Sequence, residues 1–407
     1  MTDFLFNLIV LIILLDFLLE SFLDHKNYQN WSSEMPDALK DFYTPSKYVR
    51  AFFYNQHKYL LSAITRSFSI LVLFFMIVLG GFDYIDSISR NISGESIITS
   101  VLFFIILFAG NQILMIPFQA YSTFIIENKY GFNRTKIPLF IKDNIISFIL
   151  LSILIAATVS IIIFLYELMG KNAWFLIWII FTVFLLLLQY YYTTLIVPLF
   201  NKLTLLKKDA LREKIEAYAA SINFPLENIY TMDASKRSSK ANAFFSGFGK
   251  RKTIVLHDTL LENHSDEEIV SVIAHEAGHY KRKHTLQMFI VSGISSAIML
   301  YLLFGFIDNQ YASGAVGIGT SSFHGSILAF GILFGPVSFV LGTIGNIFSR
   351  KNEFEADEFA KNTSSGKDLA LALKKFSIEH LSNLMPHKLY VFFYYTHPPV
   401  IERIQRM

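Results

Sequence analysis

A five-residue pattern, His-Glu-x-x-His, most constrains what this chain can form, and it spans His275 to His279. On a helix, positions i and i+4 project from the same face, so His275 and His279 can present two ring nitrogens to one zinc ion. Glu276 lies beside that face. There it could accept a proton from a water molecule on the metal while the metal polarises a peptide carbonyl. The pattern therefore indicates a metal-dependent peptidase.

The residues around this pattern predict that it lies on a helix. Ser265 and Glu268 have the spacing of a capping box, which marks a helix N-terminus. Apolar residues then recur at helical spacing, at Ile269, Val272, Ile273 and Ala277. We expect this helix to lead directly into the hydrophobic segment that follows. Chance matches to the pattern occur in about one such sequence in a hundred, and the helical context makes chance a poorer explanation.

The composition predicts a mainly α-helical membrane protein. Of the 407 residues, 53% are hydrophobic and only 16% are charged, which is too apolar for an ordinary soluble protein. A bilayer-spanning helix needs about 20 apolar residues. Segments of this kind occur at 4–23, 67–82, 96–116, 145–166, 173–199, 286–307 and 326–348. We therefore expect seven transmembrane helices.

The distribution of Lys and Arg predicts how these helices are oriented. The connections 83–95, 167–172 and 308–325 contain only Arg90, only Lys171 and no basic residue, respectively. The other connections carry nearly all the Lys and Arg. Because cytoplasmic loops are enriched in basic residues, we expect the N-terminus outside, and the C-terminus and the metal site facing the cytoplasm. The net charge of +3 gives no reason to expect a nucleic-acid partner.

Two imidazoles leave a zinc ion short of a third protein ligand. The chain has no Cys, so this ligand must come from His, Asp or Glu. Four acidic residues after the last hydrophobic segment compete for this role, and Glu353 follows that segment at the same depth at which His279 precedes the sixth. Glu353 and Asp357 share a helix face, which suits one of them as the ligand and the other as the acceptor of a hydrogen bond from a ligating histidine. Glu355 and Glu358 flank that face and are expected to be solvated.

The longest polar stretch between hydrophobic segments, 200–285, predicts a cytoplasmic domain. It should contain a helix over 207–222, a short strand over 228–232, and a β-hairpin formed by 243–246 and 253–256. Its basic residues are expected to lie in solvated loops: Lys236, Arg237, Lys240, Lys250, Arg251 and Lys252.

Four segments follow from these expectations. They are helices one to five with their loops (1–199), the inserted domain (200–285), helices six and seven (286–348), and the C-terminal part of the metal domain (349–407).

Asp16 and Glu20 interrupt the first hydrophobic segment one helical turn apart. Either both face the interior of the bundle or a water-filled space, as polar groups at membrane depth usually do, or Glu20 simply reaches the interface. Among the loop residues before the second segment, Lys47, Arg50 and Lys58 are expected to be solvated or to face lipid headgroups.

Six blocks of sequence together resemble the type I CAAX prenyl endoproteases, a family of seven-span zinc metalloproteases of the endoplasmic reticulum with bacterial relatives. The blocks are 117–133, 235–239 with 242–245, 254–256 with 258–261, the His-Glu-x-x-His pattern, 352–357, and 397–399 with 402–403. The pattern alone occurs in many peptidases. The blocks in this order and spacing make the resemblance specific.

The resemblance implies one zinc ion per chain on His275, His279 and Glu353, with Glu276 as the general base. Asp357 would accept a hydrogen bond from a ligating histidine. The residue spacing alone leaves open which of Glu353 and Asp357 is the ligand, and the resemblance implies that it is Glu353.

Further site residues are implied by the resemblance alone. Asn242, with Ala243 and Phe244, would hold the backbone of a substrate that adds as a strand beside this segment. His397 and Arg403 would stabilise the developing oxyanion and the ligand Glu353. The family fold is a barrel of seven helices around a water-filled chamber, closed by a gluzincin-type domain. Such a chamber would explain the polar residues within apolar segments, which are Asp16, Glu20, Asn111, Gln112 and Gln189.

The leading functional hypothesis is an endopeptidase that cuts near the C-terminus of prenylated CAAX proteins or peptides. It would act as a monomer among membrane lipids. One alternative is a quality-control peptidase of the HtpX type, with about four spans and no need for a prenyl group. A non-catalytic channel or scaffold is a third hypothesis.

The Ile-, Asn-, Lys- and Phe-rich composition suits a bacterial source, so we expect the bacterial inner membrane rather than the endoplasmic reticulum. The remaining histidines, including His284, are expected in loops or interfaces.

Overall fold

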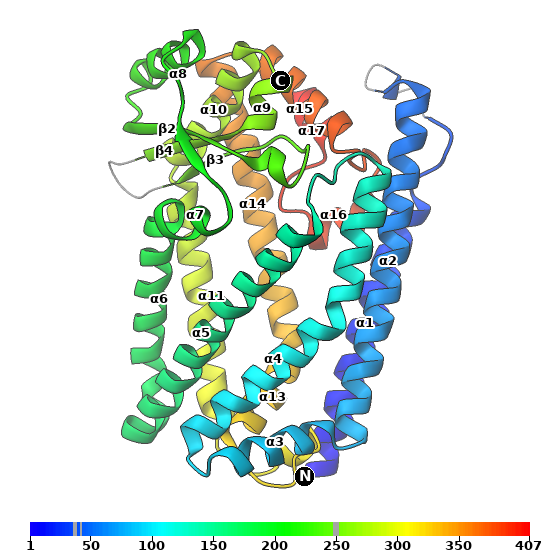
Figure 1. Ribbon diagram of the computed structural model, residues 1–407, viewed down its shortest axis with the longest axis vertical. Coiled ribbons are helices and arrows are strands. Elements are labelled where there is room, and N and C mark those ends of the chain that lie inside the picture. Colours follow the sequence, from blue (N-terminus) through cyan, green and yellow to red (C-terminus); the bar gives the residue numbers. More distant parts are fainter. Residues whose placement is uncertain (36–38, 41–42, 247–251) are drawn as a thin grey trace.

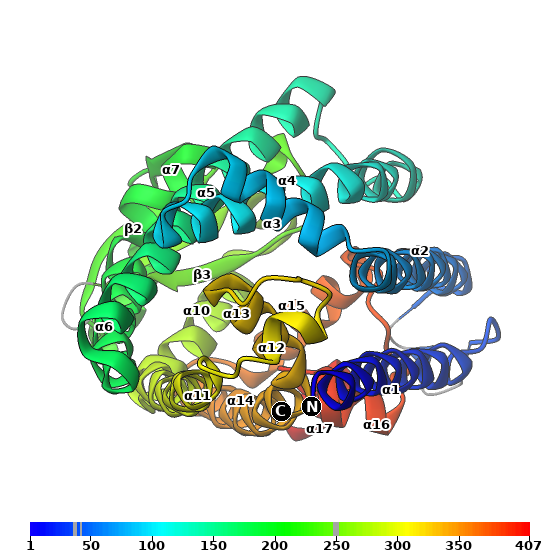
Figure 2. The same ribbon diagram turned by 90° about the horizontal axis from the view of Figure 1, so that it is seen from below.

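Long helices run along the longest axis of the molecule, and a small sheet with shorter helices lies at one end (Figure 1). The computed structural model describes residues 1–35, 39–40, 43–246 and 252–407. The N-terminus lies at the end opposite to the C-terminus and the sheet. Seen along the axis, the long helices α1, α2, α4, α5, α6, α11 and α14 form a ring (Figure 2).

The helices of the ring are α1 (Thr2–Gln29), α2 (Pro45–Val78), α4 (Ser96–Tyr121), α5 (Ile137–Met169), α6 (Ala173–Tyr191), α11 (His284–Phe306) and α14 (Gly335–Thr363). Three shorter helices, α3 (Gly81–Ile92), α12 (Ala312–Ala315) and α13 (Phe323–Leu333), lie at the end of the ring that holds the N-terminus. At the other end are α7 (Val197–Phe200), α8 (Ala210–Ser221), α9 (Asp258–Asn263), α10 (Asp266–Lys281), α15 (Gly366–Glu379), α16 (Lys388–Tyr394) and α17 (Val400–Arg406).

The expected count of seven transmembrane helices is not confirmed. Within the described residues, five helical segments are long and apolar enough to cross a membrane, or six if α13 and α14, which meet at a bend of 53°, form one span. One of the five, Ile137–Phe200, is 64 residues long. It contains both α5 and α6, which a turn at Gly170–Asn172 separates. Since about 20 residues cross a bilayer, this segment covers two of the predicted hydrophobic segments.

An ion-pair cluster links the first two helices of the ring. The guanidinium of Arg66 on α2 lies 3.0 Å from Glu20 and 2.5 Å from Asp24, both on α1. Glu20 is therefore paired with Arg66 of the neighbouring helix, which neither of the two expected positions of Glu20 included. Asp16, one turn earlier, lines a cavity together with Glu20 and Arg66. Pairing of this kind is usual for acidic residues at membrane depth.

The sheet has four strands in the order β1-β2-β4-β3. The strands are β1 (Leu203–Leu205), β2 (Leu226–Met232), β3 (Ala243–Ser246) and β4 (Lys252–His257). The predicted hairpin is confirmed as the antiparallel pair β3–β4, in which Ala243 faces Leu256 and Ser246 faces Thr253. Its connecting loop, which holds Lys250 and Arg251, lies outside the described residues. The parallel pairing of β2 with β4 was not predicted.

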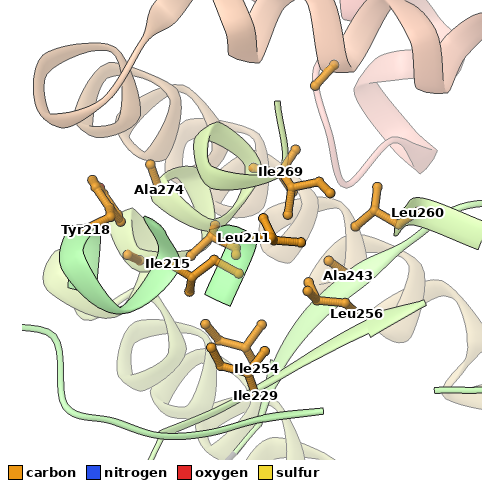
Figure 3. Packing of buried hydrophobic residues seen from close by; sticks show 14 of the residues in the cluster. Leu211, Ile215, Tyr218, Ile229, Ala243, Ile254, Leu256, Leu260, Ile269 and Ala274 are labelled. Atoms are coloured by element: carbon orange, nitrogen blue, oxygen red, sulfur yellow. The ribbon is translucent and has the colours of Figure 1, made fainter. Parts of the chain in front are cut away.

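A hydrophobic core fixes the predicted metal helix on this sheet. Apolar residues of α8, α10, β2 and β4 pack together, with Ile215, Ile254 and Ile269 at most 1% exposed (Figure 3). Burial of a side chain of this size contributes about 1.5–3 kcal/mol relative to leaving it exposed. The core therefore holds one face of α10 and leaves the opposite face for other contacts.

Three of the basic residues expected in solvated loops are instead buried or paired. Lys252 begins β4 and is buried against the ring of Tyr280. Arg237 binds Asp143 of α5 through two hydrogen bonds of 2.7 and 2.8 Å. Lys240 lies 3.0 Å from Glu127. Asp143 belongs to α5, and Glu127 ends the helical segment Ser122–Glu127, which continues α4. These pairs therefore attach the segment before β3 to the helices beneath it. The sequence could not indicate this, because the partners are about one hundred residues away.

Candidate metal centre

The residues at the two ends of helix α10 fix the position of its His-Glu-x-x-His pattern. The capping box is present: the Ser265 hydroxyl accepts from the backbone of Glu268, and the Glu268 carboxylate accepts from the backbone of Ser265. The helix does not continue into the hydrophobic segment as expected. It ends at Lys281, and Lys283 adopts a left-handed conformation with φ 59° before α11 begins at His284. This turn folds α11 back toward the end of α10.

His275, His279 and Glu353 come together as predicted, and their ligand atoms all lie within 4.8 Å of one another. The two Nε2 atoms are 3.2 Å apart. Glu353 lies 3.4 Å from Nε2 of His275 and 3.3 Å from Nε2 of His279. The three side chains come from α10 and α14, which cross at this point.

These spacings fit a tetrahedral metal ion. Two nitrogen ligands at about 2.0–2.1 Å from zinc are separated by about 3.4 Å in tetrahedral geometry, close to what the three side chains show. The local charge also favours a cation. Burial lowers the pKa of His275, but the carboxylates of Asp357 and Glu353 more than offset this and raise it to about 9. The same carboxylates would favour a metal ion in place of that proton. The residues could therefore hold a zinc ion.

Asp357 and Arg403 lie directly behind the candidate ligands. Asp357 is 2.8 Å from Nδ1 of His275, which leaves Nε2 of that ring for a metal. The buried guanidinium of Arg403 donates two hydrogen bonds of 2.8 and 2.7 Å to Asp357. It also lies 3.2 Å from Glu353. Arg403 thus holds both carboxylates, and only 6% of it is exposed.

His284 is a part of the site that the sequence did not reveal. Its Nδ1 lies 3.1 Å from Nδ1 of His279, and its Nε2 lies 3.1 Å from the carboxylate of Glu355. Each candidate histidine ligand therefore has a polar partner on its other nitrogen. The expectation that Glu355 is merely solvated is wrong, because it is paired with His284. His284, expected in a loop or an interface, is the first residue of α11 and contacts His279. The turn at Lys283 brings His284 back to α10.

Glu276 borders a cavity of about 490 Å³ that reaches the candidate ligand His279. His279 and His284 line the same cavity. Burial raises the pKa of Glu276 above its usual value, while the neighbouring imidazoles act in the opposite direction. A carboxylate with a raised pKa is a better proton acceptor near neutral pH. The structure thus places a base beside the metal ligands and next to open space.

His397 lies on the open side of the site. Its Nε2 is 3.3 Å from Glu353, while 61% of its side chain is exposed. Its Nδ1 lies 2.8 Å from the hydroxyl of Thr396. His397 can therefore contact both the ligand carboxylate and a molecule in front of the metal, whereas the buried Arg403 can act only through Glu353 and Asp357.

The predicted substrate-binding segment lies at the free edge of the sheet. β3 is an edge strand, since β4 pairs with one side of it and no described strand pairs with the other. Asn242, exposed, directly precedes the strand. Ala243 faces the hydrophobic core, and Phe244 faces Tyr192. The next two residues, Phe245 and Ser246, line the cavity beside Glu276.

The sequence matches two family models that divide it near residue 203. Residues 24–202 match the model described as CAAX prenyl protease N-terminal, five membrane helices. Residues 205–407 match peptidase family M48. The three candidate metal ligands all fall in the second part.

Eukaryotic relatives match along most of the chain. A protein of Oryza sativa subsp. japonica named CAAX prenyl protease 1 homolog is 34% identical, over 97% of this chain and 95% of its own. The human protein of the same name is 31% identical, over 82% of this chain and 80% of its own. These relatives give no support to the bacterial source that the composition suggested.

A solved structure has the same fold. The crystal structure of S. mikatae Ste24p superposes with a TM-score of 0.92 and 27% identity, and it covers 99% of this chain and 98% of the Ste24p chain. The fold, the metal-ligand geometry and the family models agree. The chain belongs to peptidase family M48, among the CAAX prenyl protease 1 homologues, and is a membrane metallopeptidase.

Proposed function

We propose that this protein is a zinc endopeptidase that hydrolyses a peptide bond near the C-terminus of prenylated CAAX proteins. His275, His279 and Glu353 would hold one zinc ion. When bound, zinc would polarise the scissile carbonyl and make an attacking water more acidic. The observation that carries the proposal is that three ligand atoms fit one tetrahedral ion while Glu276 borders a cavity beside them.

The other residues of the site divide the remaining tasks. Glu276 would take the proton of the attacking water and later deliver it to the leaving amine. His397, exposed in front of Glu353, would donate a hydrogen bond to the oxygen that becomes negatively charged. Arg403 and Asp357 would hold Glu353 and His275 in place, since they are buried and cannot reach a substrate.

The substrate backbone would add as a strand to the free edge of β3. Such an addition satisfies backbone hydrogen bonds and leaves alternate side chains for recognition. Asn242 would bind the backbone at one end of the strand. Phe245 and Ser246, rather than Phe244, would contact the substrate at the other end, because they line the cavity beside Glu276.

CAAX substrates are proposed from the names of the relatives. The HtpX-type alternative, with about four spans, is not favoured, because the match to Ste24p extends over 99% of the chain. We further propose that the metal site faces the cytoplasm, that the chain acts as a monomer among membrane lipids, and that the segments 1–199, 200–285, 286–348 and 349–407 are its functional parts. The two termini at opposite ends of the molecule support an odd number of spans.

The test compares a farnesylated CAAX peptide with the same peptide without its lipid, using purified protein with and without a zinc chelator. We expect chelator-sensitive cleavage that prefers the farnesylated peptide. Glu276→Gln should keep its zinc and lose turnover, because it removes the base but no ligand. Chelator-sensitive cleavage of both peptides alike would support a peptidase without a prenyl requirement. Cleavage by Glu276→Gln at the wild-type rate would refute the assigned base.

A further inference from the structure

A second cavity, of about 480 Å³, lies between α1, α2 and the C-terminal segment. Two of its lining residues adjoin the metal centre along the chain. Lys240 is two residues before Asn242, and Tyr395 is two residues before His397. Lys240 belongs to the segment that leads into β3, and Tyr395 belongs to the segment that carries His397. Both segments therefore form part of the wall of the second cavity.

The second cavity contains an available positive charge. Lys58 of α2 lines it with an exposed side chain. Its closest recorded partner is the ring of Tyr54, 5.5 Å from Nζ. No carboxylate of the described residues lies within ion-pair distance of Lys58, whereas Lys240 is already paired with Glu127. Asp24 also lines the cavity, but it is paired with Arg66. Lys58 can therefore attract an anion without breaking an existing pair.

The first cavity, beside Glu276, has a different character. Apolar residues make up much of its wall, among them Leu185, Leu188, Met288 and Phe245. β3 runs from the second cavity toward the first, because Lys240 precedes the strand and Phe245 and Ser246 end it. The lysine of the first cavity, Lys252, is buried against the ring of Tyr280. A peptide on the edge of β3 thus has a largely apolar cavity at one end and a cavity with the exposed Lys58 at the other.

We propose that the second cavity binds the free C-terminal carboxylate of the substrate, with Lys58 as the cation that recognises it. This rests on the proposed function, in which the substrate is a prenylated CAAX chain. The prenyl group would enter the apolar first cavity, and the charged end would enter the second. The peptide would therefore run antiparallel to β3. This orientation follows from matching each end of the substrate to the cavity of the same chemical character.

The distances along the chain agree with this placement. A CAAX sequence has three residues after the prenylated cysteine, and three extended residues span about 10 Å. Lys240 lies two residues before Asn242, which is about 7 Å of extended chain. A substrate cut beside the metal would thus place its terminal carboxylate at the entrance of the second cavity. Capture of a C-terminal carboxylate is a known mode of peptide recognition.

The experiment compares two farnesylated peptides of the same sequence, one with a C-terminal carboxylate and one with a C-terminal amide. The wild-type protein should cleave the acid with a kcat/KM about tenfold or more above that of the amide, as expected when a charged partner of one lysine is removed. Lys58→Gln should lower kcat/KM for the acid to the value for the amide, mainly through KM. Lys58→Arg should keep most of the preference.

Lys47→Gln is the matched control, since Lys47 is exposed on the same helix but does not line the cavity. It should cleave both peptides as the wild type does. Equal wild-type cleavage of acid and amide would overturn the carboxylate site and leave the proposed function standing. No cleavage of either peptide by the wild type would instead overturn the proposed function. A loss in Lys58→Gln that is equal for both peptides would show that Lys58 supports the fold or binds a lipid headgroup, and would also overturn the site.

Discussion

Gly278 and Ala356 meet where helices α10 and α14 cross, at a separation so short that a Cβ atom on Gly278 would push the neighbouring helix by a few tenths of an ångström. A Cβ atom placed on Gly278 would lie 3.0 Å from the Cα atom and 3.1 Å from the carbonyl oxygen of Ala356. Gly278 is next to His279, and Ala356 is next to Asp357. The close approach of the two backbones therefore sets the distance between the histidines of one helix and the carboxylates of the other.

Gly278→Ala should separate the two helices and weaken metal binding. The obstructing atoms are backbone, so they cannot move aside as the end of a flexible side chain could. We expect zinc affinity to fall by at least about tenfold, because the ligands must be positioned closely for a tetrahedral ion. Metal content after dialysis against a graded chelator series measures this. Gly345→Ala, on α14 with no atom within 4 Å of the new Cβ, is the control and should bind zinc normally.

Glu353→Gln should lose zinc, whereas Glu355→Gln should retain most of it. Only Glu353 places its carboxylate against both candidate histidine ligands, at 3.4 and 3.3 Å. Glu355 contacts His284 and reaches the metal site only through it. Atomic absorption on the two purified variants measures the difference. Equal zinc loss in both would mean that the wrong glutamate was assigned as the ligand.

His284→Phe should weaken zinc binding without removing a ligand. Partners on the second nitrogen of a ligating histidine usually affect metal affinity by about 10- to 100-fold, and His284 is that partner for His279. Competition with a fluorescent zinc indicator gives the affinity. His25→Phe, a change of the same kind at an exposed residue of α1, should leave it unchanged. An unaltered affinity in His284→Phe would show that His279 needs no such support.

The sequence predicted the ligands better than their surroundings, and the reason is physical. The i, i+4 spacing fixes His275 and His279 on one helix face, with Glu276 beside it, whatever the rest of the chain does. His284 was missed because its place depends on the left-handed turn at Lys283, a conformation that non-glycine residues rarely adopt.

Contacts between distant segments were also beyond the sequence. The hairpin β3–β4 was predictable, since its strands are neighbours, but the parallel pairing of β2 with β4 joins segments separated by β3. The pairing of Lys240 with Glu127 likewise depends on how the ring meets the metal domain. A run of basic residues in a polar loop does not indicate which acidic residues will pair with them. Exposure of these basic residues to solvent was therefore the expectation.

Arg350→Met should reduce catalysis while leaving the metal in place. One nitrogen of Arg350 donates to the carbonyls of Val391, at 2.9 Å, and of Tyr395, at 2.6 Å. These bonds hold the segment that ends in His397, but Arg350 contacts none of the three candidate ligands. Removing these hydrogen bonds should let His397 move away from the position where the oxyanion forms. A misplaced hydrogen-bond donor of this kind lowers the reaction rate rather than ground-state binding.

We therefore expect kcat of Arg350→Met to fall by about tenfold or more, with KM and zinc content close to the wild type. Steady-state kinetics on the farnesylated peptide and metal analysis of the same preparation separate these effects. Lys351→Met is the matched control, because Lys351 is the next residue on α14, is 70% exposed, and has only a 3.8 Å contact with Glu355. A parallel loss of zinc in Arg350→Met would show that this arginine supports α14 and the ligand Glu353 rather than the placement of His397.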